Sequence, residues 1–94
     1  MVIGLCTIDI EVAEGFSLKD KRRVVRSIVA RVRNEFNVSI AEVDNQDSWN
    51  LATLAVVCVS NDRRYADGLL QRVVGYIERE RFDCVLLDYQ IEFL

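Results

Sequence analysis

The hydrophobic pattern of this chain switches between two periods within 94 residues, and the order of these periods restricts the folds that it can adopt. Along residues 2–13 every second position belongs to one set: Val2, Gly4, Cys6, Ile8, Ile10 and Val12. Along residues 18–36 and 62–81, apolar side chains recur every three or four residues instead. A period of two predicts a strand, and a period near 3.6 predicts a helix. The chain therefore begins with a predicted strand, and two predicted helices follow.

Three further segments have the composition of strands. Residues 38–44 are short and rich in β-branched side chains, and residues 82–93 alternate again. Residues 49–60 contain the most apolar run, so we expect a central strand that is buried on both faces. The polar residues 45–48 between the second and third strands predict a turn.

The predicted order of elements is βαββαβ, and its simplest closure is a ferredoxin-like α+β sandwich. Four antiparallel strands in the order 4-1-3-2 would carry both helices on one face, through right-handed crossovers. Strands one and three would then lie at the centre of the sheet. A chain of this length holds one hydrophobic core, so we expect a single ferredoxin-like domain over 1–94.

The first predicted helix has a clear beginning. Gly15 can take a left-handed turn after the first strand. Ser17 then suits an N-cap, with Asp20 as a short capping-box partner. Its predicted apolar stripe has Ile28 beside it and comprises Leu18, Val25, Val29, Val32 and Phe36.

The basic run Ser17-Leu18-Lys19-Asp20-Lys21-Arg22-Arg23 is the most specific part of a resemblance that extends over essentially the whole chain. Other matching segments are Phe36-Asn37-Val38-Ser39, Ala41-Glu42-Val43-Asp44, Trp49 and Val59-Ser60-Asn61-Asp62. On these residues the sequence resembles the YlxP-like family of small bacterial proteins of unassigned function. The resemblance implies a ferredoxin-like fold and a gene neighbourhood near translation-initiation and ribosome-maturation factors. It implies no catalytic residue.

Positive charge is concentrated in the first predicted helix. Residues 18–36 carry seven basic and two acidic side chains, whereas the whole chain has a net charge of −3. At 100° per residue, five of the basic side chains share one flank, which we call the basic ridge: Lys19, Arg22, Arg23, Arg26 and Arg33. The acids Asp20 and Glu35 fall on the other side, where Glu35 can pair with Arg31.

An unpaired row of arginines attracts phosphate, because each guanidinium offers a two-pronged set of donors. Lys19 and Arg22 also lie near the helix N-terminus, whose dipole favours an anion. The basic ridge therefore predicts a contact with RNA or with an acidic protein. The alternative is a solvated helix face, or one that forms salt bridges to acids elsewhere in the fold.

The second predicted helix carries tyrosines and arginines that we place on the side away from its core: Tyr65, Arg72, Tyr76 and Arg79. Such residues can stack on bases or anchor a protein interface. Gly68 and Gly75 lie on the same side and predict a close approach by the first helix or by another subunit. The alternative is ordinary packing with arginines that extend to solvent.

The other face of the predicted sheet is half apolar and half acidic. We expect Leu5 and Leu86 near its middle, with a polar set formed by Thr7, Asp9, Glu11, Asp88, Gln90 and Glu92. An RNA-recognition sheet carries aromatic residues on its central strands, and these strands have almost none. This face is therefore a better candidate for homodimer formation.

Catalysis and metal binding have little support in the sequence. The chain has no histidine, and its three cysteines, Cys6, Cys58 and Cys84, are far apart inside apolar runs, which is typical of buried thiols. Its glycines are isolated and form no phosphate-binding loop. We expect no cofactor and no metal.

Partners and compartment follow from the charge and from the apolar runs. No run is long enough for a membrane span, and the N-terminus resembles no secretory signal, so we expect a cytoplasmic protein without a membrane partner. The net charge predicts no general affinity for DNA. The main hypothesis is a non-catalytic protein that binds ribosomal RNA or a ribosome-associated partner. The alternative is a small homo-oligomeric domain for protein interaction or ligand sensing.

Overall fold

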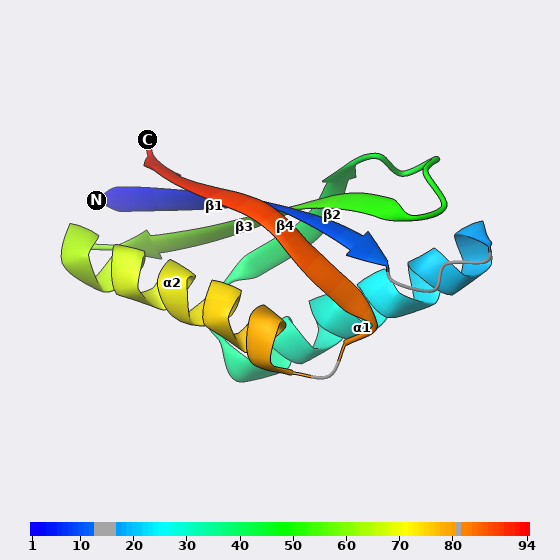
Figure 1. Cartoon of the computed structure of the whole chain (residues 1–94). Coiled ribbons are helices and arrows are strands. Elements are labelled where there is room, and N and C mark those ends of the chain that lie inside the picture. Colours follow the sequence, from blue (N-terminus) through cyan, green and yellow to red (C-terminus); the bar gives the residue numbers. More distant parts are fainter. Residues whose placement is uncertain (13–16, 81) are drawn as a thin grey trace.

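A computed structural model of the protein describes residues 1–12, 17–80 and 82–94. Along the chain the elements are β1 (Val2–Val12), α1 (Leu18–Glu35), β2 (Ser39–Asp44), β3 (Leu51–Ser60), α2 (Arg63–Arg79) and β4 (Cys84–Phe93). The predicted turn at Gly15 lies outside the described residues, as do the predicted strand end at 13 and helix end at 81. Figure 1 shows a layer of strands above a layer of helices.

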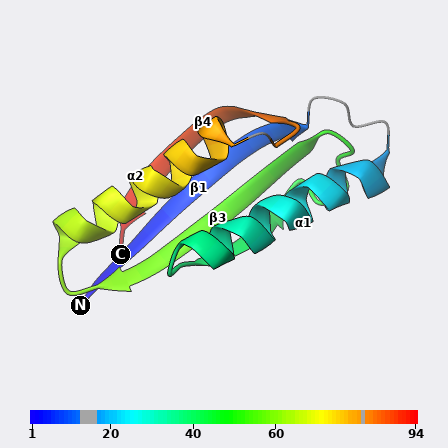
Figure 2. The same cartoon turned by 90° about the horizontal axis from the view of Figure 1, so that it is seen from below.

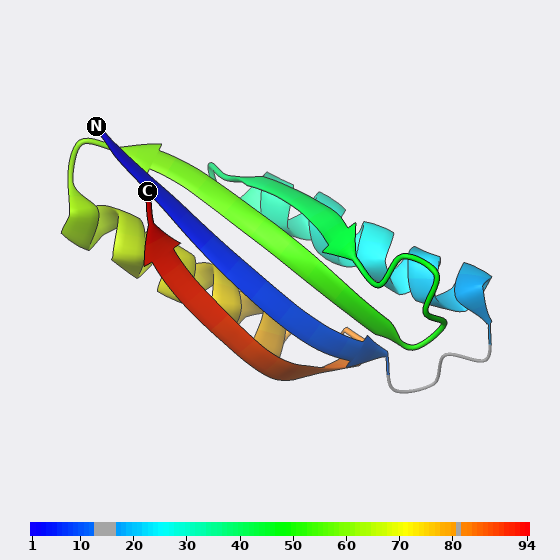
Figure 3. The same cartoon turned by 90° about the horizontal axis from the view of Figure 1, so that it is seen from above.

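The strands form one antiparallel sheet in the order β2-β3-β1-β4. This is the predicted order 4-1-3-2 read from the opposite edge, so the predicted ferredoxin-like α+β fold is confirmed. Both helices cover the same face of the sheet, as the view from below shows (Figure 2). The opposite face, seen from above, carries no helix (Figure 3), and we call it the open face.

The core lies between the sheet and the helices. Cys6, Ile8 and Ile10 of β1 are fully buried there, which confirms the predicted alternation of the first strand. The central strand β3 was expected to be buried on both faces, and this expectation is wrong. Leu54 is fully buried on the helix side, but Val59 is 68% exposed because its side of the strand belongs to the open face.

The predicted start of α1 is confirmed. Ser17 is the N-cap, and its Oγ accepts a hydrogen bond from the Asp20 backbone N–H at 3.2 Å. The buried stripe is rotated relative to the predicted one, since it consists of Lys21, Val25, Ile28 and Val32. Leu18 and Val29 are only half-buried. The buried stripe is rotated because it includes a lysine, Lys21. The predicted stripe was drawn from apolar residues alone and therefore did not include it.

Tyr76 of α2 does not lie on the side away from the core. It is buried, and its ring packs edge-on against Phe36 at a centroid distance of 5.5 Å and against Phe82 at 6.2 Å. Tyr76 follows Val73 by three positions, so one turn of helix brings it beside the buried stripe. These three rings join the end of α1 to α2 and to the start of β4.

The two glycines of α2 are not contacted by α1 within the described part of the chain. A Cβ at Gly75 would lie 2.9 Å from Nη1 of Arg79, and one at Gly68 would lie 3.5 Å from Nη1 of Arg72. Each glycine is thus covered by the arginine four positions later in the same helix. The predicted close approach by the first helix is wrong, because α2 uses this space for its own side chains.

A β-bulge in β4 changes which of its residues face the core. The register between β1 and β4 shifts between Asp9 and Ile10, so that Asp9 pairs with Asp88 and Ile10 pairs with Leu86. Leu86 therefore packs against the core, whereas Val85 and Leu87 are exposed. The prediction that Leu86 lies on the open face is wrong, because one extra residue in a strand reverses the alternation beyond it.

Candidate nucleic-acid interface

The basic ridge lies on the flank of α1 that is turned away from α2. On the other flank, Arg31 Nη2 donates to Glu80 Oε1 at 3.1 Å, just beyond α2. On the ridge side, Arg33 Nη2 donates to the Ile40 backbone carbonyl at 3.0 Å, near the start of β2. Figures 1 and 3 show that α1 and this edge strand run in opposite directions, so the helix that carries the ridge extends along the edge of the sheet from the β2–β3 loop back to the start of β2.

Three cations of the ridge remain available for a ligand. Lys19, Arg22 and Arg26 are exposed, and none has an ion-pair or hydrogen-bond partner among residues 1–12, 17–80 and 82–94. They lie at intervals of three and four positions, so they share one side of α1 over two turns. Within these residues, no strand acid neutralises the ridge.

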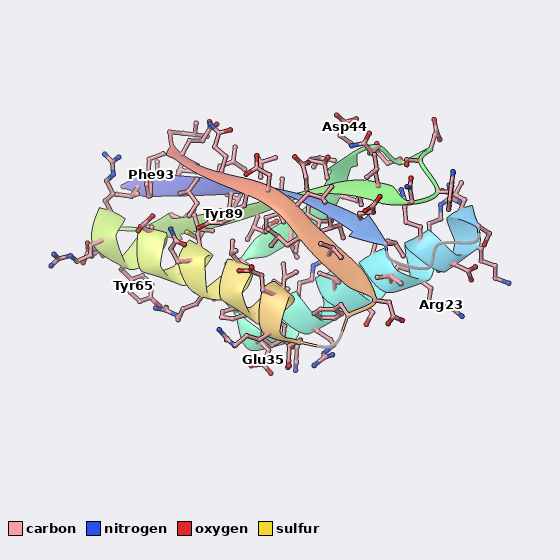
Figure 4. The ribbon with its side chains drawn as sticks, in the orientation of Figure 1. Arg23, Glu35, Asp44, Tyr65, Tyr89 and Phe93 are labelled. Atoms are coloured by element: carbon pink, nitrogen blue, oxygen red, sulfur yellow. The ribbon has the colours of Figure 1, made fainter. Side chains whose placement is uncertain are left out.

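The other two members of the ridge have internal partners. Arg23 Nη2 donates to Asp20 Oδ1 at 3.0 Å, so the expectation that Asp20 lies apart from the ridge is wrong. A pair three positions apart on one helix face forms readily, and an exposed pair of this kind contributes only about 0–1 kcal/mol. Arg33 is fastened to the backbone of β2 through Ile40. Figure 4 shows Arg23 near the beginning of α1 and Glu35 at its end.

Arg31 does not pair with Glu35 as expected. Besides its bond to Glu80, its guanidinium lies over two rings of the aromatic cluster, 4.9 Å from the centroid of Phe82 and 5.8 Å from that of Tyr76. Arg31 therefore fastens α1 to the end of α2 and is not part of the ridge.

Lys21 is the important residue that the sequence reasoning missed. It is fully buried, and its ammonium donates to Glu42 Oε2 at 2.9 Å. The same nitrogen donates to the backbone carbonyls of Asn45 at 2.8 Å and Leu51 at 3.1 Å, and the Gln46 carbonyl lies 3.4 Å from it. A signal was present, because Lys21 precedes Val25 by four positions and Ile28 by seven and so belongs to the same helix face.

Besides Lys21, side chains of the β2–β3 loop itself hold its conformation through hydrogen bonds. Asn45 is left-handed, with φ 62°, and its Nδ2 donates to Thr53 Oγ1 at 2.9 Å. Thr53 Oγ1 donates in turn to Asp9 Oδ1 at 2.8 Å. Ser48 Oγ accepts from the Leu51 backbone N–H at 3.0 Å. Trp49, which was expected to begin the third strand, therefore lies in the loop, and β3 begins at Leu51.

The candidate interface on α2 divides in two. Tyr65 is exposed on the outer side of the helix (Figure 4), and the guanidinium of Arg72 lies 5.8 Å from the centre of its ring. Arg79 is exposed on the same outer side of α2, and its guanidinium lies over Gly75. Tyr76 belongs to the core, so the four residues do not form one surface.

The open face combines an acidic row with an apolar half. In the strand register, Thr53 of β3 lies opposite Asp44 of β2 on one side and opposite Asp9 of β1 on the other, and Asp9 lies opposite Asp88 of β4. Three carboxylates therefore lie in one row across the sheet. Such a row repels phosphate. Among the described residues no cluster of acidic or sulfur side chains is arranged to hold a metal ion.

The three cysteines are free thiols, as expected. Burial raises the pKa of Cys6 to about 11 and also raises the pKa of Cys58. Burial and then the charge of Asp83 raise the pKa of Cys84. Because the thiolate is the nucleophile, these environments disfavour cysteine chemistry at neutral pH.

The structure thus defines a ferredoxin-like α+β domain whose first helix exposes a basic flank along one edge of the sheet. The chain belongs to the family described as "Protein of unknown function (DUF503)", which matches residues 3–91. It is also 38% identical over 77 residues to "Uncharacterized protein YlxP" of Bacillus subtilis (strain 168), which covers 82% of this chain and 84% of that protein. These matches confirm the resemblance to the YlxP-like family. No described helix is both long and apolar enough to cross a membrane.

Proposed function

We propose that this protein is a non-catalytic binding protein that contacts RNA, in a ribosomal particle or a translation-associated complex, through the basic ridge. The observation that carries the proposal is the row formed by Lys19, Arg22 and Arg26, which is exposed and has no anionic partner within the described residues. At a rise of about 1.5 Å per residue, this row extends over about 10 Å of helix. The gene neighbourhood implied by the family resemblance is what favours a translation-associated complex over other RNA.

The two partnered arginines can join this contact. Arg23 can exchange Asp20 for a phosphate at small cost, because an exposed pair is weak. Arg33 uses one donor for the Ile40 carbonyl, and a guanidinium has five. The acidic row of the open face lies on the other side of the sheet and directs a polyanion to α1.

Co-sedimentation with ribosomal particles from a cell lysate tests the proposal. We expect Lys19→Glu, Arg22→Glu and Arg26→Glu together to abolish association, because they reverse the charge of the ridge. In the wild type, each phosphate contact to a single strand contributes about −0.7 to the slope of log K against log salt. Three contacts therefore predict a slope of about −2.

The matched control carries the same number of charge reversals on α2, at Arg64, Arg72 and Arg79, which are all exposed. We expect this control to retain association. Association that is insensitive to salt, or that survives reversal of the ridge charges, would refute the proposal. An equal loss in both triple variants would show that only the total charge matters.

The apolar half of the open face supports a second candidate, which is a homo-oligomer. Ile3 pairs with Val59 and Leu5 pairs with Val57 on this face, and no described element covers them. Two copies related by a two-fold axis could bury these residues against each other. Sedimentation velocity at increasing concentration should then show a dimer that Val59→Asp abolishes, and a strictly monomeric wild type would refute this candidate.

A further inference from the structure

The protein has a single tryptophan, and it is not in the core. The side chain of Trp49 is 56% exposed, in the loop between β2 and β3. Among the residues that the structure describes, no ring and no guanidinium stacks on its indole. Burying an indole is strongly favourable, so a tryptophan left at the surface is a candidate contact for a partner.

The loop that carries Trp49 is already ordered. Lys21 binds backbone carbonyls on both sides of Trp49, at Asn45 and at Leu51. Ser48 Oγ, one residue before the tryptophan, also accepts from the Leu51 backbone N–H. A ligand that contacts the indole would therefore not have to order the loop first, which lowers the entropic cost of binding.

The same lysine positions the loop relative to the basic ridge. Lys21 lies between Lys19 and Arg22 in the chain, in the first turns of α1, and its ammonium reaches the loop beside the N-terminal end of the helix. Figures 1 and 3 both show the β2–β3 loop next to these first turns. The loop that carries the exposed indole is thus held near the end of the helix where the cations without a partner among the described residues begin.

We infer that Trp49 and the basic ridge form one binding site for single-stranded RNA, in which the indole stacks on an unpaired base and Lys19, Arg22 and Arg26 contact the phosphates that follow. The inference rests on the proposed function and narrows its ligand to a single strand. Only an unpaired base exposes a ring face for stacking, and aromatic side chains beside a cationic surface are the usual means of binding single strands. Asp44 at the end of β2 and Asp47 in the loop repel phosphate, so the backbone of the RNA strand stays on the ridge.

Intrinsic fluorescence tests the inference directly, because all tryptophan emission comes from Trp49. The unlabelled wild type is titrated with a mixed-sequence single-stranded RNA of about ten nucleotides, and binding is followed in parallel by the anisotropy of the same RNA carrying a fluorophore. We expect tryptophan quenching to saturate at the same protein-to-RNA ratio as the anisotropy. A duplex of the same length should leave the emission unchanged.

Two variants separate the contribution of base stacking to RNA binding from the contribution of charge. Trp49→Ala should weaken single-strand binding roughly 5- to 150-fold, the effect of losing one stacked base, and should leave the salt dependence unchanged. Arg22→Glu with Arg26→Glu should weaken binding and also reduce the salt slope. Far-UV circular dichroism checks that both variants keep the fold, which is expected because all three side chains are exposed.

The outcomes distinguish the inference from the proposed function. If Trp49→Ala binds like the wild type and RNA leaves the emission unchanged, while the double arginine variant still weakens binding, the stacking inference is overturned and the proposed function stands. If the wild type binds neither single-stranded nor duplex RNA, both are overturned. Equal quenching by the duplex would also overturn the inference.

Discussion

Replacing Lys21 with methionine should destabilise the protein far more than replacing the other lysine of the chain, Lys19. Methionine keeps an aliphatic chain of similar length but removes the ammonium, which is fully buried and donates to Glu42 and to loop carbonyls. The variant therefore leaves the carboxylate of Glu42 and the carbonyls of Asn45 and Leu51 without their donor.

The expected cost follows from the burial of the partners. Breaking a fully buried ion pair by removing one partner costs about 3–5 kcal/mol. The side chain of Glu42 is 17% exposed, so water recovers part of its hydration, and we expect about 2–4 kcal/mol. For a domain of this size, such a loss lowers the midpoint of thermal unfolding by about 8–32 °C.

Urea denaturation followed by far-UV circular dichroism measures this cost. The control is Lys19→Met, two positions earlier in the same helix, whose side chain is exposed and should change stability by less than about 0.5 kcal/mol. A double-mutant cycle with Glu42→Gln should show a coupling of about 0.5–3 kcal/mol. Equal costs for Lys21→Met and Lys19→Met, or strict additivity in the cycle, would refute the role assigned to Lys21.

Two further predictions concern the core. Gly4→Ala should destabilise the protein by about 1–3 kcal/mol in urea denaturation, because the added Cβ would lie 3.0 Å from Leu70 Cδ1 and 3.3 Å from Cys58 Sγ; a stabilised variant would contradict this packing. Burial raises the pKa of the Cys6 thiol to about 11, so this thiol stays protonated in the folded state and contributes no pH dependence to the free energy of unfolding below about pH 8.5. Above about pH 8.5 the free energy of unfolding should fall as the pH rises to about 11, because only the unfolded state then loses the proton. This fall should be smaller in Cys6→Ala, and identical pH profiles for the two proteins would contradict the prediction.

Several features were predictable because they depend on neighbours in the sequence. The alternation of β1, the cap formed by Ser17 and the exposed flank of α1 all follow from local periodicity and from the chemistry of one side chain. The strand order followed from the few closures that a βαββαβ chain allows. These rules do not require knowledge of what packs against a residue.

Other features depended on distant segments and were missed. Tyr76 is buried because Phe36 and Phe82 come from other elements to meet it. Leu86 faces the core because of a bulge, and the alternating pattern of β4 does not show where its register against β1 shifts. Arg23 and Arg33 belong to the predicted ridge, but the partners that they find, Asp20 and the Ile40 carbonyl, had not been foreseen.

Periodicity and charge are local properties of the chain, so the order of elements, the strand arrangement and the concentration of positive charge on one helix could be predicted from the sequence. Which of those charges stay at the surface depends on the tertiary structure. It buries Lys21 against the β2–β3 loop and leaves Lys19, Arg22 and Arg26 exposed beside it. The physical reason is that the cost of burying an ammonium depends on the acceptors around it, and these come from residues 42–51, more than twenty positions further along the chain.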